Sequence, residues 1–224
     1  MLIIFDLDGT LIDSSRDLAI SMNATRARFN LPPLDQHVIN SYVGNGAAVL
    51  VRRAMGSGVT DETVAEALAY FLKYYRAHSL EHTQLYSGIR EAVDELAARG
   101  HLLAVLTNKP RRISFDILAG LGIGQRFLCV YGGDSLNSKK PEPDGIWRIV
   151  EEAGASLSQT LMIGDSKVDI ETARNAGVRS CGVAWGFQPE TFKEKRPDFL
   201  IDQPAALVPL IESLTLDSLR EADA

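Results

Sequence analysis

LIIFDLDGTL, at residues 2–11, joins an apolar run to two aspartates in this 224-residue chain. An apolar run that ends in a glycine-containing turn is typical of a buried strand, so Asp6 and Asp8 are expected in the loop at its carboxyl end. Two carboxylates in a partly dry crevice repel each other unless a cation, a shared proton or donor groups compensate. The pattern favours a divalent metal. A helix-loop-helix calcium site does not fit, because its loop needs another acid or amide at Thr10 and a glycine at Leu11.

The composition is that of an ordinary globular protein, with 46% hydrophobic and 23% charged residues. A formal net charge of −6 argues against nucleic acid or an anionic membrane as the main partner. We find neither a signal peptide nor an apolar stretch of membrane-spanning length, and we therefore expect a cytoplasmic protein, as a monomer or homodimer. Cys129 and Cys181 lie in apolar segments and are expected to be reduced core residues.

Strands and helices are predicted to alternate from Gly88 onward. Apolar runs predict strands near 102–106, 127–131, 161–163, 178–183 and 199–201, with helices between them and a last helix from Pro204. This alternation indicates an α/β fold, with a Rossmann-type parallel sheet that is covered on both faces. The acidic tail from Thr215 is expected to fray.

Residues 14 to about 83 carry helical patterns and no convincing strand. We expect helices at 14–29, 36–41 and 47–55, and a long helix that Thr60 caps. The segment Ser14-Ser15-Arg16-Asp17 has the form of a capping box for the first of these. The block interrupts the first strand-to-helix connection, so we interpret 14–85 as an inserted helical cap over a core made of 1–13 and 86–224.

Polar residues follow several of the predicted strands, where parallel sheets bind their ligands. Asp6 and Asp8 follow the first strand, Thr107 and Asn108 the second, and Asp165 and Asp169 a later one. Phosphoryl transfer needs a nucleophile in line, a metal, donors for the phosphate oxygens and a proton source for the leaving group.

Each of these parts has a candidate. Asp6 is the expected nucleophile, which would form an aspartyl phosphate, and Asp8 is the expected general acid and base. Mg²⁺ prefers oxygen ligands, which Asp6, Asp165 and the backbone carbonyl of Asp8 would provide, while Asp169 would orient them. Thr107 and the amide of Asn108 would bind phosphate oxygens. Lys140 would offset the remaining negative charge.

With these residues assembled, the chain resembles the haloacid dehalogenase superfamily of phosphatases over essentially its whole length. The resemblance is carried by Asp6-Leu7-Asp8-Gly9-Thr10, Thr107-Asn108, Lys140-Pro141 and Gly164-Asp165-Ser166-Lys167-Val168-Asp169. It implies a haloacid dehalogenase-like core with a C1-type α-helical cap, Mg²⁺ as cofactor and a small phosphorylated metabolite as substrate.

Within the superfamily, the chain is most similar to the phosphoglycolate phosphatases. The marks of this subfamily are Tyr42-Val43-Gly44-Asn45-Gly46-Ala47 in the cap and Gly132-Gly133-Asp134-Ser135 before Lys140-Pro141-Glu142-Pro143. The similarity implies hydrolysis of 2-phosphoglycolate, with a cap donor for its carboxylate. The candidates are Asn45, the amides near Gly44 and Gly46, and Arg52 or Arg53, although an Arg pair on a helix is more often solvated surface.

Several alternatives stay open at this point. Related hydrolases act on other small phosphates or on pyrophosphate, and a phosphomutase of the β-phosphoglucomutase type would share the first motif and a helical cap. A dehalogenase is disfavoured, since Asp8 and Thr10 belong to phosphate and metal chemistry. A phosphorylation switch that resembles response-regulator receivers would lack a helical insert of this size.

Overall fold

The computed structural model describes the backbone of residues 1–222 and the side chains of residues 1–216. Its centre is a six-stranded sheet in the order β5-β4-β1-β6-β7-β8, in which every neighbouring pair is parallel. The strands are β1 (Leu2–Phe5), β4 (Leu102–Leu106), β5 (Cys129–Tyr131), β6 (Thr160–Gly164), β7 (Arg179–Val183) and β8 (Phe199–Ile201). The predicted α/β parallel sheet is confirmed.

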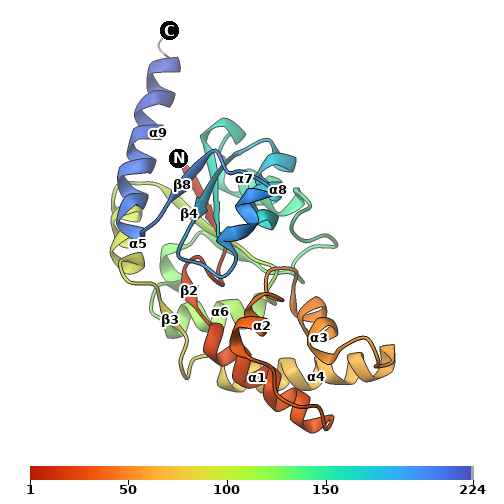
Figure 1. Cartoon of the computed structure of the whole chain (residues 1–224). Helices are drawn as coiled ribbons and strands as arrows, with labels where there is room; N and C mark the ends of the chain where they lie inside the picture. The colour runs from red at the N-terminus through yellow and green to blue at the C-terminus, as the bar shows by residue number, and fades with distance from the viewer. Residues whose placement is uncertain (223–224) are drawn as a thin grey trace.

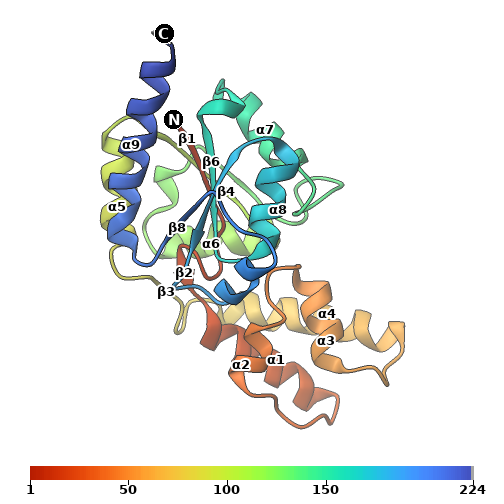
Figure 2. The ribbon, with the colours of Figure 1, turned by 45° about the horizontal axis from the view of Figure 1, so that its top comes forward.

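Helices cover both faces of this sheet, as Figure 2 shows. The helices are α5 (Ile89–Ala98), α6 (Arg111–Gly120) and α9 (Leu207–Ala222) in one set, and α7 (Asp144–Ala153) and α8 (Lys167–Ala176) in the other. Four short 3-10 helices lie at Gly124–Arg126, Leu157–Gln159, Pro189–Lys193 and Pro204–Ala206. Helix α9 continues past Thr215, where we expected fraying, and residues 223–224 of that tail lie outside the described residues.

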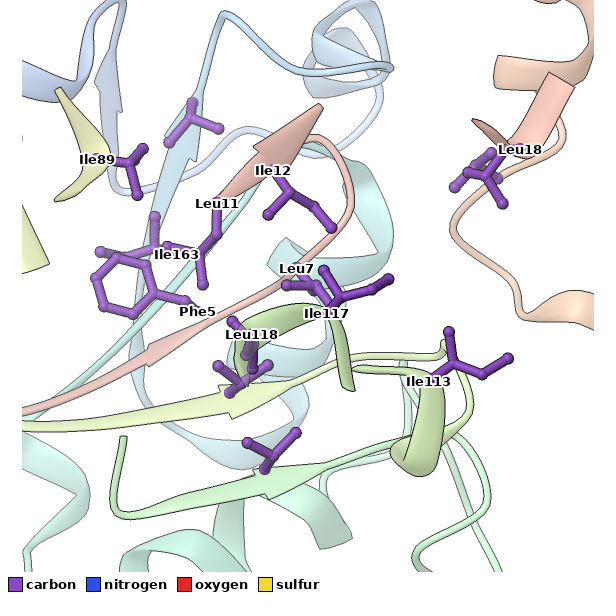
Figure 3. Packing of buried hydrophobic residues seen from close by; sticks show 14 of the residues in the cluster. Phe5, Leu7, Leu11, Ile12, Leu18, Ile89, Ile113, Ile117, Leu118 and Ile163 are labelled. Carbon is purple, nitrogen blue, oxygen red and sulfur yellow. The ribbon is translucent and has the colours of Figure 1, made fainter. Parts of the chain in front are cut away.

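The alternation of side chains along β1 places its residues in two different cores. Ile3 and Phe5 belong to one cluster with apolar residues of α5, α6 and α9. Leu2 and Ile4 belong to a second cluster with residues of α7 and α8. Figure 3 shows part of the first cluster, in which Phe5 of β1 and Ile163 of β6 lie near residues of α6. A strand that is apolar on both faces is therefore explained by burial on both faces.

A helical lobe lies at one end of this core, as Figure 1 shows. It consists of α1 (Ser15–Arg28), α2 (Gln36–Asn40), α3 (Ala47–Met55) and α4 (Asp61–His78), which pack on one another. The lobe joins the core through β2 (Ile12–Asp13) and β3 (Gln84–Leu85), which form a two-stranded antiparallel ladder that the sequence did not suggest. Because both connections pass through this ladder, the lobe has a narrow attachment to the core.

The capping box expected at Ser14–Asp17 is wrong. The Ser14 hydroxyl makes no cap hydrogen bond and donates instead to Asp8 Oδ1 at 2.5 Å. Asp17 Oδ2 accepts three hydrogen bonds from the residues that precede β3. The donors are His82 N at 2.9 Å and Thr83 N and Thr83 Oγ1 at 2.8 Å each. Tertiary partners therefore outcompete the local cap. By contrast, Thr60 caps α4 as predicted, since its side chain accepts from Thr63 N.

Among the described residues, the structure contains no helix that is both long and apolar enough to span a membrane.

We predict that Asp17→Ala lowers the free energy of unfolding by about 2–4 kcal/mol, because buried donors of His82 and Thr83 lose their acceptor. Urea denaturation would measure this loss. Arg16→Ala, at the exposed neighbouring position, is the matched control and should change stability by less than about 0.5 kcal/mol. An equal effect of the two substitutions would contradict the role of Asp17 as the tie between the two ends of the lobe.

Candidate active site

The polar residues that follow the strands come together at the carboxyl end of the sheet. Asp6 follows β1, and its backbone N–H donates to Ile163 O of β6 at 2.8 Å. Thr107 follows β4, and its N–H donates to Tyr131 O of β5 at 2.9 Å. Asp165 follows β6 directly. Because β4, β1 and β6 are neighbours in the sheet, the loops after them share one crevice.

Three carboxylates form a buried cluster in this crevice. Asp6, Asp165 and Asp169 each offer one oxygen, and these oxygens all lie within 4.8 Å of one another. Lys140 Nζ is 2.8 Å from Asp6 Oδ1 and 2.6 Å from Asp169 Oδ1. One ammonium group cannot neutralise three carboxylates, so the cluster keeps an excess of negative charge when all are ionised.

Burial and the neighbouring charges together raise the pKa values of Asp6 and Asp165. Burial raises the pKa of Asp6 to about 6, although the nearby Lys140 lowers it and Asp169 raises it further. Burial also raises the pKa of Asp165 well above its ordinary value, and the charges of Asp169 and Asp6 add to that effect. A second positive charge at this position would offset the repulsion between the carboxylates.

The donor set fits a hard divalent cation. Carboxylate oxygens gathered in a buried crevice are the ligands that Mg²⁺ prefers. Asp165 is fixed in place, because its Oδ2 accepts from Phe187 N at 2.6 Å. Gly9 has a φ of +82°, and a Cβ atom there would lie 2.2 Å from Asp165 Oδ2. Only glycine therefore lets the turn after Asp8 approach the cluster so closely.

Asp169 is positioned by its own helix. It lies in the first turn of α8, where its Oδ2 accepts from Ser166 N at 3.1 Å and from Ser166 Oγ at 2.8 Å. This capping box holds the Asp169 side chain, and its other oxygen faces Lys140. Asp169 therefore takes part in the cap of α8 and also belongs to the acidic cluster.

The Asp8 carboxylate points away from the cluster. Its Oδ1 accepts from Ser14 Oγ at 2.5 Å and from Lys109 Nζ at 2.7 Å. Of the predicted metal ligands, the side chains of Asp6 and Asp165 are therefore brought together, whereas the ligand expected from Asp8 is its backbone carbonyl. This places the two aspartates of the first motif in different surroundings, one beside other acids and one beside a cation.

The loop between α2 and α3 of the lobe closes over the crevice. Asn108 Nδ2 donates to Gly44 O at 2.8 Å and also to Lys140 O at 2.9 Å. Lys139 Nζ donates to Asn45 O at 3.0 Å, and Gln188 Nε2 donates to Val43 O at 2.8 Å. In the contacts with Gly44, Asn45 and Val43, the core supplies the donor and the lobe supplies a backbone carbonyl.

A cavity lies between the acids and the lobe. Its walls include Asp6, Asp8, Asp165, Thr107 and Asn108 from the core and Gly44 and Gly46 from the lobe. Asn45 is not among the lining residues, and neither are Arg52 and Arg53, which are exposed on α3. Arg52 pairs with Asp61 at the surface. The two arginines that the sequence offered as carboxylate donors therefore lie outside the cavity.

Sequence reasoning missed Lys109 and Tyr75, although both line the cavity. Lys109 follows Thr107-Asn108 directly, so its place in the strand-end loop was available as a signal. Tyr75 lies on the apolar face of α4, where its spacing indicated a core residue. Its hydroxyl accepts from Lys109 Nζ at 2.6 Å, a contact that no local pattern predicts.

We predict that Lys140→Met lowers the free energy of unfolding of the metal-free protein by about 3–5 kcal/mol at pH 7.5, because it leaves buried carboxylates without their cation. The loss should be smaller at pH 5. Carboxyls with a raised pKa destabilise the fold as they ionise, and at pH 5 Asp6, with a pKa of about 6, is largely protonated. Urea titrations at the two pH values would measure the difference.

The control for this variant is Lys193→Met, at an exposed position away from the cluster, which should change stability by less than about 0.5 kcal/mol at either pH. A loss from Lys140→Met that does not depend on pH would contradict the electrostatic explanation.

Comparison with known proteins gives a consistent result. Residues 3–183 match the model of a family described as haloacid dehalogenase-like hydrolase. A phosphoglycolate phosphatase of Pseudomonas putida is 39% identical over 214 residues, which are 93% of this chain and 78% of that protein. One of Vibrio vulnificus is 38% identical over 219 residues, which are 94% and 95% of the two chains.

A solved structure is also similar over most of its length. The crystal structure of a predicted phosphoglycolate phosphatase from Haemophilus somnus has a TM-score of 0.88 and 33% identity, covering 93% of this chain and 96% of that one. The chain therefore belongs to the haloacid dehalogenase-like hydrolase family, and its relatives place it among the phosphatases of that family.

Proposed function

We propose that this chain is a Mg²⁺-dependent phosphomonoester hydrolase that acts on 2-phosphoglycolate through an aspartyl phosphate on Asp6. The similarity to proteins named phosphoglycolate phosphatase supports the choice of substrate. The observation that carries the chemistry is the placement of Asp6 and Asp8, two residues apart, in unlike surroundings. Asp6 lies among acids at a cation-binding position, and Asp8 lies beside Lys109.

Asp6 and Asp165 would hold Mg²⁺, together with the backbone carbonyl of Asp8, and Asp169 would keep these ligands in place. When bound, the ion supplies positive charge against both the carboxylates and the phosphate oxygens. The excess negative charge of the cluster and the raised pKa values of Asp6 and Asp165 support this assignment.

Asp6 would attack phosphorus as the bond to the leaving oxygen breaks, and Asp8 would give a proton to that oxygen. Asp8 would then take a proton from the water that attacks the aspartyl phosphate, which releases phosphate and restores Asp6. Asp6 contacts Lys140, whereas Asp8 contacts Ser14 and Lys109, which supports placing the two carboxylates on different sides of the reacting group.

The phosphate oxygens need donors that are already in position. We assign Thr107 Oγ1 and the backbone N–H of Asn108 to this task, while Lys140 Nζ, which contacts Asp6 and does not line the cavity, would offset the negative charge on phosphate and Asp6. The Asn108 side chain is engaged with the carbonyls of Gly44 and Lys140, so its backbone N–H is the group left for phosphate. Burial of Thr107 and Lys140 strengthens what each group contributes.

We further propose that residues 14–85 act as the cap and that 1–13 and 86–224 act as the catalytic core. The narrow attachment through β2 and β3 supports a lobe that moves as a unit. The segment Gly44-Asn45-Gly46 would bind substrate at the edge of the cap, since Gly44 and Gly46 line the cavity. Closure over a cavity of this kind suits a small phosphorylated metabolite.

The test is phosphate release from a panel of small phosphomonoesters and pyrophosphate, with and without Mg²⁺. Metal-dependent turnover that strongly favours 2-phosphoglycolate would support the whole proposal. Preference for another member would keep the Asp6 chemistry and change the substrate. A sugar phosphate that is isomerised without phosphate release would favour the phosphomutase instead.

Asp6→Asn should lower kcat by at least about 1,000-fold, since an amide cannot attack phosphorus. Circular dichroism should show the fold retained. Asp35→Asn, at an exposed position whose side chain makes no cap hydrogen bond, is the control and should retain full activity. If Asp6→Asn kept more than a tenth of the activity, another residue would have to be the nucleophile.

Mg²⁺ should stabilise the protein more at pH 7.5 than at pH 5. Its ligands must be ionised, and at pH 5 the Asp6 carboxyl, with a pKa of about 6, is mostly protonated. Thermal unfolding at a series of Mg²⁺ concentrations would show the difference as a larger rise of the midpoint at pH 7.5. Asp165→Asn should remove most of that rise. A Mg²⁺ effect equal at the two pH values would refute binding at this cluster.

A further inference from the structure

Lys109 is the only cationic residue among those that line the cavity in the described part of the chain. It lies after β4, in the loop that leads into α6, and only 7% of its surface is exposed. A lysine is rarely buried to this degree unless its charge has a partner. The mechanism proposed above gives this charge no task of its own.

The ammonium group lies between the core and the cap. Lys109 Nζ donates to Asp8 Oδ1 at 2.7 Å and to the Tyr75 hydroxyl at 2.6 Å. It also lies 4.5 Å from the centroid of the Tyr75 ring. A lysine has three donors, and the third has no protein acceptor among the described residues. One hydrogen-bond direction is therefore available to a bound molecule.

The walls of the cavity on the cap side are apolar. They are formed by Leu18, Val43, Leu50, Phe71 and Leu72, and Tyr75 is the one residue with a hydroxyl group among the described residues on this side. A leaving group that extends from the phosphate toward the cap meets these side chains. An anionic substituent there would be poorly solvated, and it would also be repelled by the carboxylates of the cavity. The positive charge of Lys109 offsets both effects, and the Tyr75 hydroxyl lies beside it.

We propose that Lys109 Nζ and the Tyr75 hydroxyl form a subsite that binds an anionic substituent of carboxylate type on the leaving group. This inference rests on the proposed hydrolase function and names the residues that select its substrate. The subsite combines a residue of the core with one of the cap, so it is complete only when the cap is closed. It takes the role of carboxylate donor that the sequence suggested for Arg52 or Arg53, which lie outside the cavity.

The subsite separates substrates by charge. An ester whose leaving group carries a carboxylate gains a charge-assisted hydrogen bond from Lys109, and an ester of similar size with an uncharged leaving group does not. Selectivity of this kind is a difference of affinities, so a substrate pair that differs mainly in that charge reveals it. 2-Phosphoglycolate and ethyl phosphate are such a pair.

The experiment compares kcat/KM for these two esters in the wild-type protein and in Lys109→Met and Tyr75→Phe. For Lys109→Met, we expect the ratio of the two values to fall by about 10- to 100-fold, as for the loss of a hydrogen bond to a charged group. Tyr75→Phe keeps the ring and should lower the ratio by about 3- to 10-fold. Lys73→Met, at an exposed position of α4, is the control and should leave the ratio unchanged.

An equal loss for the two esters in Lys109→Met would overturn the proposal, because Lys109 would then act only through Asp8. Tyr75→Phe provides the same test should Lys109→Met not fold. If the wild-type protein hydrolysed neither ester, the proposed function would fail. Calorimetry in an Asp6→Asn background would then compare the affinities for the two esters and so test the subsite separately. Preference for 2-phosphoglycolate that disappears with Lys109→Met would support it, and absence of a preference would overturn it.

Discussion

The repulsion among carboxylates at the carboxyl end of the sheet is the constraint around which the site is built. Asp6, Asp165 and Asp169 are buried within a few ångströms of one another, and among the described side chains Lys140 is the one ammonium that contacts the group. Other features of the fold hold these acids despite their repulsion. The capping box of α8 fixes Asp169, the Phe187 amide fixes Asp165, and glycine at position 9 makes room for Asp165.

The contacts between cap and core divide into two kinds. Asn108, Lys139 and Gln188 donate to backbone carbonyls of the loop that follows α2, and such contacts do not depend on the side chains of that loop. The contact between Lys109 and Tyr75 depends on both side chains. Closure in general could therefore rely on the first kind, while discrimination between substrates would rely on the second.

Much of the fold could be predicted from the sequence because its signals are local. The apolar runs and their spacing predicted the parallel sheet, and the two apolar faces of β1 match burial in two separate clusters. Residues at strand ends were expected to meet, since the topology of a parallel sheet brings those ends to one edge. For the same reason Asp6, Thr107 and Asp165 could be named before their geometry was known.

Local patterns could not decide between competing partners. Ser14 and Asp17 fit a capping box by spacing, but Asp8 and Thr83 are their partners in the folded chain. The antiparallel ladder of β2 and β3 is only two residues long on each side, too short for a periodic signal. Lys109 reaches Asp8 across 101 positions of sequence. The sequence by itself determined which groups could do chemistry and at which strand ends they lie. Which of these groups pair with one another was decided by tertiary packing, because a buried charge is costly unless an opposite charge or a hydrogen-bond partner lies beside it.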